Sequence, residues 1–574
     1  MSETVKEIWE PHAPAGAGGL RPLGAEGPAL RANGTASIRT LADGVVEVST
    51  EGPGQVRIEW RVPCVDATAL WTPEPRGTGW LPAAWSAPRR TRLAAGAPIA
   101  ALVGTGDVAL CAFAAERPDV LAGAGVVEET GEFRFWAQAE GRLTVRIDTS
   151  GRHFARCLAD LTAWWGSGRT VDIPDAARLP AYSTWYSMHQ DVTPERIETQ
   201  AALGKELGLD VIIVDDGWMT ADRTRGYAHC GDWEPVSLPD TAEHVRRVHD
   251  LGVRYLLWYA LPFIGKDSAA HRKLGRHALA DEPKLGAIVA DPRYPEVRDF
   301  LADRLARAVE EWGMDGLKVD FVDRFAHADP PAAGPEADCA DLDEGVERLL
   351  AAIRRRVTAA QPEAMVEYRQ PYVSPGLWPY VTMIRATDCP LGGQENRQRT
   401  VDLRLAAGPV PVHSDMLMWH PAEPPEQIAC HLIDVLFAVP QISVDLAAQR
   451  PEQREALAFW LGVFRTHLDT LQRGELRPAR PDLGYPMVTA LGGETVAVAR
   501  YAALPVDASG TGWRTFLVAN ADADPDVRLV GGSGTAVATV QDARGRTVRR
   551  GEVELERAEP IPVPRGGLLT LRRG

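Results

Sequence analysis

The sequence predicts an α/β protein in which a (β/α)8 TIM barrel is flanked by an N-terminal β-sandwich and a C-terminal antiparallel β-domain. Its 574 residues are enough for about three domains of ordinary size. Both ends of the chain alternate apolar and polar residues with the period of strands, whereas the middle alternates short apolar runs with helical patterns. We therefore expect three domains, at residues 1–178, 179–473 and 474–574.

The two end segments read as β-structure. The first carries four stretches of period two, separated by Gly, Pro and Asp clusters that are typical of turns. They are Val45–Ser49, Val56–Val62, Phe133–Ala137 and Leu143–Ile147. Short strands at this spacing favour a β-sandwich. The last segment has the same character, and we expect a small antiparallel sandwich from Thr495–Tyr501, Thr515–Val518 and Leu568–Leu571.

The middle segment alternates helix signals with short apolar runs. Thr193 followed by Pro194 is typical of a helix start, and an apolar face from Val297 to Trp312 ends at Gly313. Eight apolar runs between such helices predict the strands of a barrel, a fold of about 250 residues. The predicted strands are Ser183–Ser187, Val211–Asp215, Arg254–Tyr259, Leu317–Phe321, Met365–Arg369, Met383–Asp388, Val410–Ser414 and Ile442–Leu446.

Charge and composition exclude several classes of partner. The net charge is −16 and the chain has no basic block that could replace phosphate counterions, so we expect no nucleic-acid partner. No run of about 18 apolar residues occurs, so we expect no membrane span. The seven Cys are scattered, without a disulfide or zinc pattern, and the first residues lack an apolar signal region. A cytoplasmic protein without a metal or an organic cofactor is the expectation.

Polar residues cluster where the predicted barrel strands end. This is the face on which barrel enzymes build their active sites. Acids at the ends of several successive strands are costly unless they serve a site. The candidate site residues are Trp185, Asp215, Asp216, Trp218, Trp258, Lys318, Asp320, Glu367, Arg369, Arg385 and Asp388, with His413 and Asp415 as further polar residues of the seventh strand.

Two of these acids fit the chemistry of a glycosidase, which needs one ionised and one protonated carboxyl group. Lys318 and Asp320 alternate on one strand and so point the same way, into the barrel mouth. The ammonium group favours the ionised form of Asp320. Asp388 follows a strand two positions away and can converge on the same space as the proton donor.

Each residue also has a structural interpretation. An Asp at a strand end commonly serves a turn or a helix cap, and a Lys-x-Asp strand can hold an interior ion pair. The tryptophans can be core residues, since indole rings are mostly buried. By strict alternation Arg385 points away from the side of Asp388, so its contact with substrate requires a bend at the strand end.

Three segments together resemble the α-galactosidase clan of glycoside hydrolases. They are Asp215-Asp216-Gly217-Trp218, Lys318-Val319-Asp320 and Arg385-Ala386-Thr387-Asp388, and they are most similar to microbial α-galactosidases and plant raffinose synthases. The resemblance implies an N-terminal β-supersandwich, a catalytic barrel and a C-terminal β-domain, with a possible homo-oligomer. It covers most of the barrel and is only architectural elsewhere.

The resemblance also implies residue roles. Asp320 corresponds to the nucleophile and Asp388 to the acid/base of a retaining exo-α-glycosidase. Asp215 and Asp216 correspond to the pair that binds the distal hydroxyls, and Lys318 to a further hydroxyl contact. Of the remaining candidates, Trp185 and Trp258 correspond to residues that line the sugar pocket.

Two departures from the family pattern concern the substrate. Val319 replaces the Trp of many relatives, which is closer to the raffinose-synthase pattern. Glu367-Tyr368-Arg369-Gln370-Pro371-Tyr372 stands where the family has a Cys- and Gly-rich motif that contacts the second-carbon substituent. The identity of the glycone is therefore open.

Hydrolysis of terminal α-galactosides or a close analogue is the leading hypothesis, with a small oligosaccharide or glycoside as substrate. A transglycosylase would keep the site and pass the sugar to another sugar. A metal-dependent barrel hydrolase is less favoured because no H-x-H pattern or set of His ligands is found. A non-catalytic carbohydrate-binding protein remains a third alternative.

Overall fold

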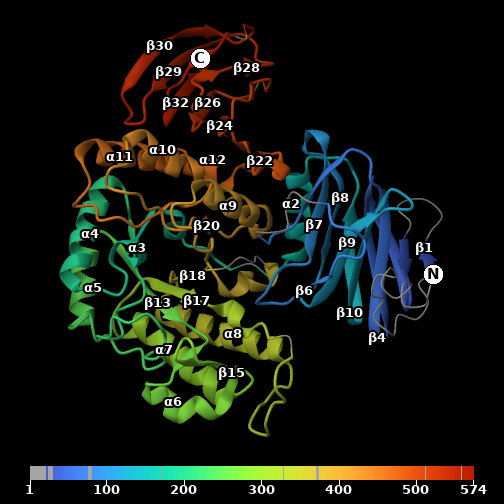
Figure 1. Cartoon of the computed structure of the whole chain (residues 1–574), viewed down its shortest axis with the longest axis vertical. Coiled ribbons are helices and arrows are strands. Elements are labelled where there is room, and N and C mark those ends of the chain that lie inside the picture. Colours follow the sequence, from blue (N-terminus) through green and yellow to red (C-terminus); the bar gives the residue numbers. More distant parts are fainter. Residues whose placement is uncertain are drawn as a thin grey trace.

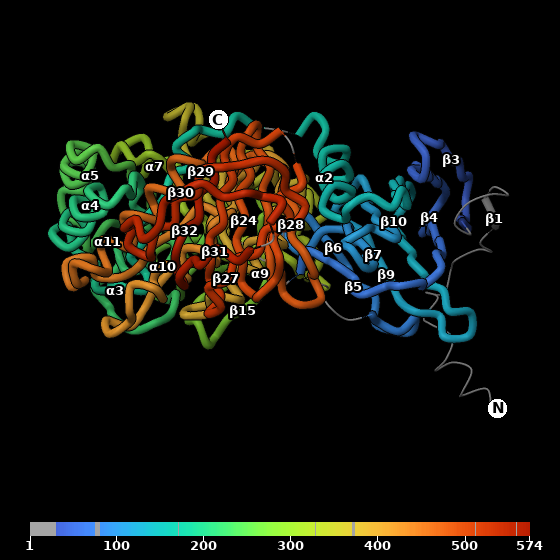
Figure 2. Tube along the Cα trace, turned by 90° about the horizontal axis from the view of Figure 1, so that it is seen from above, coloured from blue at the N-terminus to red at the C-terminus, as the bar shows by residue number. Residues whose placement is uncertain are grey.

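The protein, described by a computed structural model, consists of a parallel barrel and two large β-sheets that pack against different sides of it. The structure describes residues 21–23, 30–74, 81–169, 171–327, 329–369, 374–510, 512–557 and 559–573. In Figure 1 the N-terminal sheet lies beside the barrel and the C-terminal sheet lies above it. Seen from above in Figure 2, the C-terminal sheet covers the barrel, whereas the N-terminal sheet extends to one side.

The N-terminal sheet has ten strands. The two longest, β4 (Val45–Pro63) and β10 (Glu132–Asp148), pair with each other in its middle. All four stretches of period two lie in these strands, so this part of the prediction is confirmed. Trp60 stacks on Phe135 in the core of the sheet, with ring centroids 5.5 Å apart. The other strands are β1 (Arg21–Leu23), β2 (Leu30–Ala32), β3 (Thr35–Ala42), β5 (Ala67–Trp71), β6 (Arg89–Thr91), β7 (Ile99–Gly104), β8 (Ala109–Ala115) and β9 (Val120–Val127).

The barrel sheet has eight parallel strands in the order β20-β19-β18-β17-β13-β12-β11-β21. Backbone bonds close the ring, because the Val439 N–H donates to Val412 and the Ser414 N–H donates to Val439, at 2.8 and 2.9 Å. The predicted fold class is thus confirmed. The strands are β11 (Ala181–Ser183), β12 (Val211–Val214), β13 (Arg254–Ala260), β17 (Gly316–Asp320), β18 (Met365–Arg369), β19 (Met383–Arg385), β20 (Val412–His413) and β21 (Gln441–Ile442).

The first barrel strand was misplaced by the sequence pattern. It ends at Ser183, and the short helix α3 (Trp185–Met188) follows instead of a continued strand. The Ser443 hydroxyl accepts from the backbone N–H groups of Tyr186 and Ser187, which turns the chain out of the sheet. The sixth strand is also shorter than expected, since it ends at Arg385, before Asp388.

Helices pack around the barrel strands. Thr193 accepts from the N–H of Arg196 at the start of α4, and α7 precedes Gly313, as the sequence predicts. A small three-stranded sheet of β14 (Phe263–Gly265), β15 (Ala278–Glu282) and β16 (Ala287–Ala290) lies between β13 and α7. The helices are α4 (Pro194–Leu207), α5 (Thr241–Asp250), α6 (Ala269–Leu274), α7 (Pro295–Glu310), α8 (Leu342–Ala360), α9 (Gly393–Ala407), α10 (Pro425–Asp434), α11 (Pro451–Thr466) and α12 (Leu468–Arg473).

The C-terminal sheet has seven strands. Their order is β22 (Glu475–Ala479), β23 (Met487–Gly492), β24 (Thr495–Arg500), β26 (Thr515–Asn520), β32 (Gly567–Arg572), β29 (Thr535–Gln541) and β30 (Thr547–Glu554). The sheet is antiparallel except for β24 and β26, which run parallel. Within the described ranges, no helix is long and apolar enough to cross a membrane.

One buried carboxyl group joins the three parts of the chain. Asp402 of α9 accepts a hydrogen bond from the Trp71 indole of the N-terminal sheet, at 2.8 Å, and another from the hydroxyl of Tyr485. Burial raises the pKa of Asp402 to about 7. No cation among the residues that the structure describes pairs with this group, so its protonation state affects how the three parts hold together.

Candidate active site

Side chains from every second residue of the barrel strands fill the barrel interior. An apolar cluster that includes Val211, Ile213, Leu256, Met365 and Met383 forms its floor. The interior residues two or more positions further along the strands are polar, which places them toward the C-terminal mouth. The strand register sets Lys318 beside Trp258 and Glu367, and Arg369 beside Arg385. The structure thus brings the predicted polar residues of the middle strands together.

Asp320 ends β17 and accepts three hydrogen bonds. The donors are the Arg369 Nε at 2.5 Å, the Trp258 indole at 3.0 Å and the backbone N–H of Phe321 at 2.8 Å. Phe321 has a φ of 65°, which is uncommon for a residue with a large side chain. This turn aims the Phe321 N–H back at the carboxylate. The three donors hold the carboxylate of Asp320 in one orientation at the end of β17.

Arg369 lies between the two carboxyl groups that the sequence singles out. Besides its bond to Asp320, its guanidinium approaches Asp388 at 3.8 Å. The same group lies over the Phe321 ring, 4.7 Å from the centroid, which helps to fix its position. A single side chain therefore contacts both proposed catalytic residues. Residues 370–373, which include the rest of the unusual motif Gln370-Pro371-Tyr372, lie outside the described residues.

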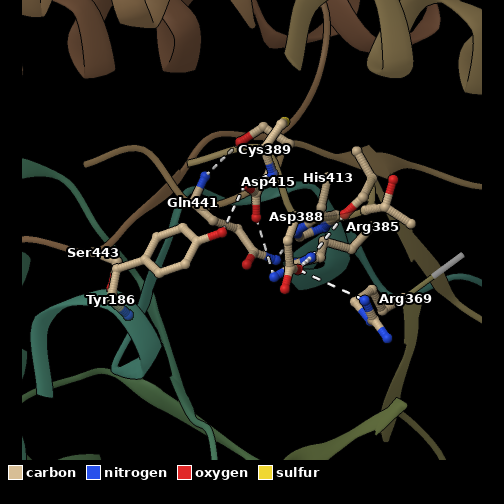
Figure 3. A network of polar contacts seen from close by, with 12 residues as sticks. Tyr186, Arg369, Arg385, Asp388, Cys389, His413, Asp415, Gln441 and Ser443 are labelled. Carbon is tan, nitrogen blue, oxygen red and sulfur yellow. Dashed lines mark hydrogen bonds and ion pairs between the residues drawn. The ribbon is translucent and has the colours of Figure 1, made fainter. Parts of the chain in front are cut away.

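Asp388 lies beyond the end of β19 and its side chain is 43% exposed. Arg385 donates to it at 2.7 Å, because the chain leaves β19 after Arg385 and brings Asp388 to the same side (Figure 3). Desolvation opposes ionisation of Asp388, but Arg385 and Arg369 outweigh it and hold its pKa well below the usual range. In this state Asp388 is a carboxylate, whereas a proton donor must be protonated.

Asp215 and Asp216 follow β12 and are both buried. The Lys318 ammonium donates to Asp215, and the Gln190 amide donates to Asp216 at 3.1 Å. One oxygen of Asp216 has no partner among the described residues. Desolvation and the neighbouring Asp215 raise the pKa of Asp216 to about 7. The unpartnered oxygen fits a hydroxyl group supplied by a ligand.

A second polar layer lies beneath these groups. Glu367 is fully buried and accepts from the Gln441 amide at 2.6 Å, with the His413 Nδ1 3.5 Å away. Desolvation raises the pKa of Glu367 to about 7 although Lys318 and Arg385 oppose the shift. Glu367 is thus a buried neighbour of Lys318 and Arg385 and has no surface open to the mouth.

The roles expected of two tryptophans need correction. Trp218 has no exposed surface; it packs on Trp233 and Tyr259, and its N–H donates to the Trp258 carbonyl at 2.9 Å. Trp258 is 1% exposed and reaches the site only through its N–H on Asp320. Neither ring face is free to stack on a sugar. Trp185 is half-buried on α3, with Arg225 5.7 Å from its ring.

The sequence pattern missed Tyr186 and Gln441 and left Asp415 undecided. Asp415 is fully buried and accepts from the Tyr186 hydroxyl at 3.0 Å and the Cys389 N–H at 2.6 Å. Arg385 contacts it at 3.2 Å, so this one guanidinium links Asp388 to Asp415 (Figure 3). Gln441 was missed because the eighth strand begins one residue earlier than predicted. Tyr186 was missed because it lies in α3 and not in a strand.

The mouth and the layer beneath it hold six carboxyl groups and three cations. The acids are Asp215, Asp216, Asp320, Glu367, Asp388 and Asp415, and the cations are Lys318, Arg369 and Arg385. Burial raises the pKa of Asp216, Glu367 and Asp415. No group of metal-ligating side chains occurs anywhere in the described ranges.

Comparison with known proteins agrees with this geometry. Residues 177–349 match the Melibiase family model, a segment that includes Asp215, Lys318 and Asp320 and ends before Glu367. The chain is α-galactosidase-like in sequence and fold. It is 26% identical over 147 residues to a bifunctional α-galactosidase/sucrose kinase of Mediterraneibacter gnavus, covering 24% of this chain and 16% of that protein.

Other relatives differ in the activity that their names give. Over 170 residues the chain is 28% identical to the α-galactosidase AgaA of Geobacillus stearothermophilus, covering 28% of this chain and 23% of the relative. It is 26% identical over 294 residues to an A-type blood α-D-galactosamine galactosaminidase of Flavonifractor plautii, covering 44% and 24%. These alignments span a quarter or less of the curated relatives' length.

Solved structures share the fold over nearly the whole chain. The galactosidase domain of the α-galactosidase–sucrose kinase AgaSK superposes with a TM-score of 0.64 at 15% identity, covering 92% of this chain and 78% of that one. The GH36 α-galactosidase AgaA of Geobacillus stearothermophilus gives 0.61 at 14% identity, covering 96% and 88%. At this sequence identity the similarity establishes the fold and does not identify the substrate.

Proposed function

We propose that the protein is a retaining exo-α-glycosidase that hydrolyses terminal α-galactosides or a close analogue, with Asp320 as nucleophile and Asp388 as acid/base. The observation that carries this proposal is the threefold donor set on Asp320 at the end of β17, in a mouth that also holds Asp388. The named activities of the relatives support the same class of substrate. Small oligosaccharides or glycosides are the proposed substrates.

In the proposed reaction the Asp320 carboxylate attacks the anomeric carbon while Asp388 gives a proton to the departing oxygen. The bond from the sugar to the leaving group breaks and a covalent glycosyl–enzyme forms. Asp388, now ionised, takes a proton from water, which attacks the same carbon and releases Asp320. Both displacements invert the anomeric carbon, so the product keeps the α-configuration.

This mechanism requires Arg369 to move away from Asp388 when substrate binds. With Arg385 and Arg369 both beside it, Asp388 is ionised and cannot donate a proton. A sugar seated between Asp320 and Asp388 occupies the space that the guanidinium spans. Loss of this cation and the accompanying desolvation both raise the pKa of Asp388. The Arg385 hydrogen bond at 2.7 Å must also weaken before Asp388 can hold a proton.

Hydroxyl recognition falls to Asp215, Asp216 and Lys318 in this proposal. They offer two buried carboxyl groups and one ammonium within a connected network. One relative is named as a galactosaminidase. Galactosamine differs from galactose at the second carbon, where an amino group replaces a hydroxyl. We therefore propose α-galactosides as the first candidates and α-galactosaminides as the close analogue to test beside them.

Transfer of the sugar to another sugar is the second candidate. The Val319 substitution suggests it, but that side chain is fully buried and packs in the core on the outer side of β17, away from the mouth. Val319 thus has no direct contact with an acceptor. Analysis of products with and without added acceptor sugars separates hydrolysis from transfer. A protein that binds galactose without turnover would support the non-catalytic alternative.

We also propose a cytoplasmic location and domain limits near residues 178 and 473. All seven cysteines are free, which agrees with a reducing compartment. Self-association remains a proposal from the resemblance alone.

The proposal is tested first on a panel of p-nitrophenyl α- and β-glycosides that includes α-galactoside and α-galactosaminide. The wild type should cleave one α-glycoside, and Asp320→Ala should lose about 10³-fold or more in kcat. Azide should restore turnover of Asp320→Ala and yield the β-glycosyl azide, because it attacks from the face that the carboxylate vacates.

Matched variants make the result decisive. Asp323→Ala, two residues after Phe321, removes a nearby carboxyl group that has no role in the proposed reaction. It should keep turnover within about threefold of the wild type. Azide rescue of Asp323→Ala instead of Asp320→Ala would reject the assigned nucleophile. An α-glycosyl azide from Asp320→Ala would reject the retaining mechanism.

A further inference from the structure

A second pocket lies where the N-terminal sheet, the barrel and the start of the C-terminal sheet meet, outside the barrel mouth. Its volume is about 760 Å³, which is in the range of sites for small metabolites. One wall is helix α2 (Phe154–Trp165), which contacts both α9 and β22. In Figure 1 this helix lies between the N-terminal sheet and the rest of the molecule.

Two arginines in the wall lack a carboxylate partner. Arg178 donates to the Pro409 carbonyl at 2.7 Å, and Arg404 donates to the carbonyls of Phe437, Leu471 and Gln472. Neither forms an ion pair with any residue that the structure describes. Carbonyl groups carry only partial charges, so they satisfy the N–H groups without neutralising the cations.

The surroundings of these two cations are unfavourable for positive charge. Burial and the nearby Arg473 lower the pKa of Arg178 to about 10, and burial together with Arg178 lowers that of Arg404 to about 10. Two nearby acids, Asp175 and Asp469, are already paired with Arg473, at 2.8 and 2.5 Å. Glu475 of the pocket wall pairs with Arg156 and Arg477. Two adjacent buried cations without an anion are costly to fold around.

The rest of the wall is also rich in donors. The Trp378 indole N–H and the Gln472 amide nitrogen are buried and find no acceptor among the described residues. The Trp378 ring packs directly against Gly166 and Gly408, where a Cβ atom would overlap the indole. Four arginines line the pocket against one acid, Glu475, so its wall carries excess positive charge.

We propose that this junction pocket binds a small organic oxyanion of about the size of a sugar, a phosphate ester or a carboxylate, through Arg178 and Arg404. Guanidinium groups bind both kinds of oxyanion by charge and by N–H donation. Such a ligand would connect three parts of the chain and so stabilise their packing.

Calorimetric titration with inorganic phosphate, glucose 6-phosphate, glucuronate and neutral glucose tests the proposal. We expect saturable binding of one phosphorylated or carboxylated probe per chain and none of glucose. Inorganic phosphate binding as tightly as glucose 6-phosphate would assign the site to the free ion. Absence of saturable binding by all three anions at millimolar concentration would overturn the proposal.

A negative charge introduced into the pocket tests whether the anion binds there. Ala163 lines the pocket from an exposed position of α2. Ala163→Glu should weaken anion binding by about tenfold or more, whereas Ala163→Gln, which has nearly the same shape, should weaken it by less than about threefold. Arg178→Gln should act like Ala163→Glu. Equal effects of the Glu and Gln variants would place the anion elsewhere and overturn the proposal.

Discussion

Arg369 is the residue on which the state of the catalytic mouth depends. It holds Asp320 at 2.5 Å and approaches Asp388 at 3.8 Å, so one side chain acts on the proposed nucleophile and on the proposed acid. The guanidinium stabilises the ionised form of Asp388. This opposes the role of a proton donor, so in the proposed reaction substrate must displace the contact with Asp388.

Replacing Arg369 should therefore separate the two effects. In Arg369→Met the pKa of Asp388 should rise, because one of the three cations that lower it is removed. The form with protonated Asp388 then persists to higher pH, so the basic limb of kcat/KM against pH should shift upward. We expect the shift together with a loss of about 10- to 100-fold in kcat from the weakened Asp320.

Arg399→Met is the control for the general effect of losing a cation nearby. Arg399 donates to the Thr387 hydroxyl and the Asp388 carbonyl, and pairs with Glu395 at 2.5 Å, without an ion pair to the Asp388 carboxylate. In Arg399→Met the basic limb of kcat/KM against pH should stay where it is in the wild type. An unmoved limb in Arg369→Met would show that Asp388 does not set that limb.

At the scale of elements, the turns after the strands position the acids more strictly than the strands do. After β12, Gly217 has a φ of 108° and lies against the backbone of Gln190, the residue whose amide bonds Asp216. A Cβ atom at Gly217 would lie 2.8 Å from the Gln190 carbonyl oxygen. Only glycine fits this conformation and this space.

Gly217→Ala should push Gln190 away from Asp216. We expect a loss of about 1–3 kcal/mol in the free energy of unfolding and a rise in KM for the glycoside substrate. Gly313→Ala provides the comparison, because Gly313 has a φ of 71° with open space around its Cβ position. It should cost stability through backbone strain alone and leave KM unchanged. Equal KM in both variants would argue against a role for this turn in binding.

The sequence predicted the elements better than their ends. Alternation placed Lys318 and Asp320 inside the barrel correctly, since residue spacing alone decides the face of a strand. Spacing could not show that the chain leaves the sheet at Ser183 and Arg385, because those exits depend on Ser443 and Asp415, which are distant in the sequence. Trp218 was expected at the site because composition cannot distinguish a sugar platform from a core residue.

At the scale of the whole molecule, Asp402 makes the packing of the three parts sensitive to pH. Its pKa is about 7 in the folded state, above the ordinary value of 3.8. The folded state therefore holds a proton that the unfolded state releases above pH 4. The free energy of unfolding should fall as the pH rises from about 4 to about 7, and this contribution should be constant above that range.

Asp402→Asn should remove this dependence. The amide oxygen can still accept from Trp71 and Tyr485, and the side chain no longer ionises. Between pH 5 and pH 8 the free energy of unfolding of the variant should rise by on the order of 2–4 kcal/mol relative to that of the wild type. Chemical denaturation at each pH measures this difference. Asp250→Asn, on the exposed surface of α5, is the control. Its free energy of unfolding should depend on pH in the same way as that of the wild type. Parallel curves for Asp402→Asn as well would exclude Asp402 as the source.

Two buried acids of the barrel site, Asp216 and Glu367, can release protons near neutral pH. An iminosugar carries a positive charge and adds a fourth cation, which favours ionisation of Asp216 and Glu367, whose pKa values are about 7. A proton should then leave the protein as the inhibitor enters. Near neutral pH the observed heat of binding should vary with the ionisation enthalpy of the buffer, and the slope counts the protons released.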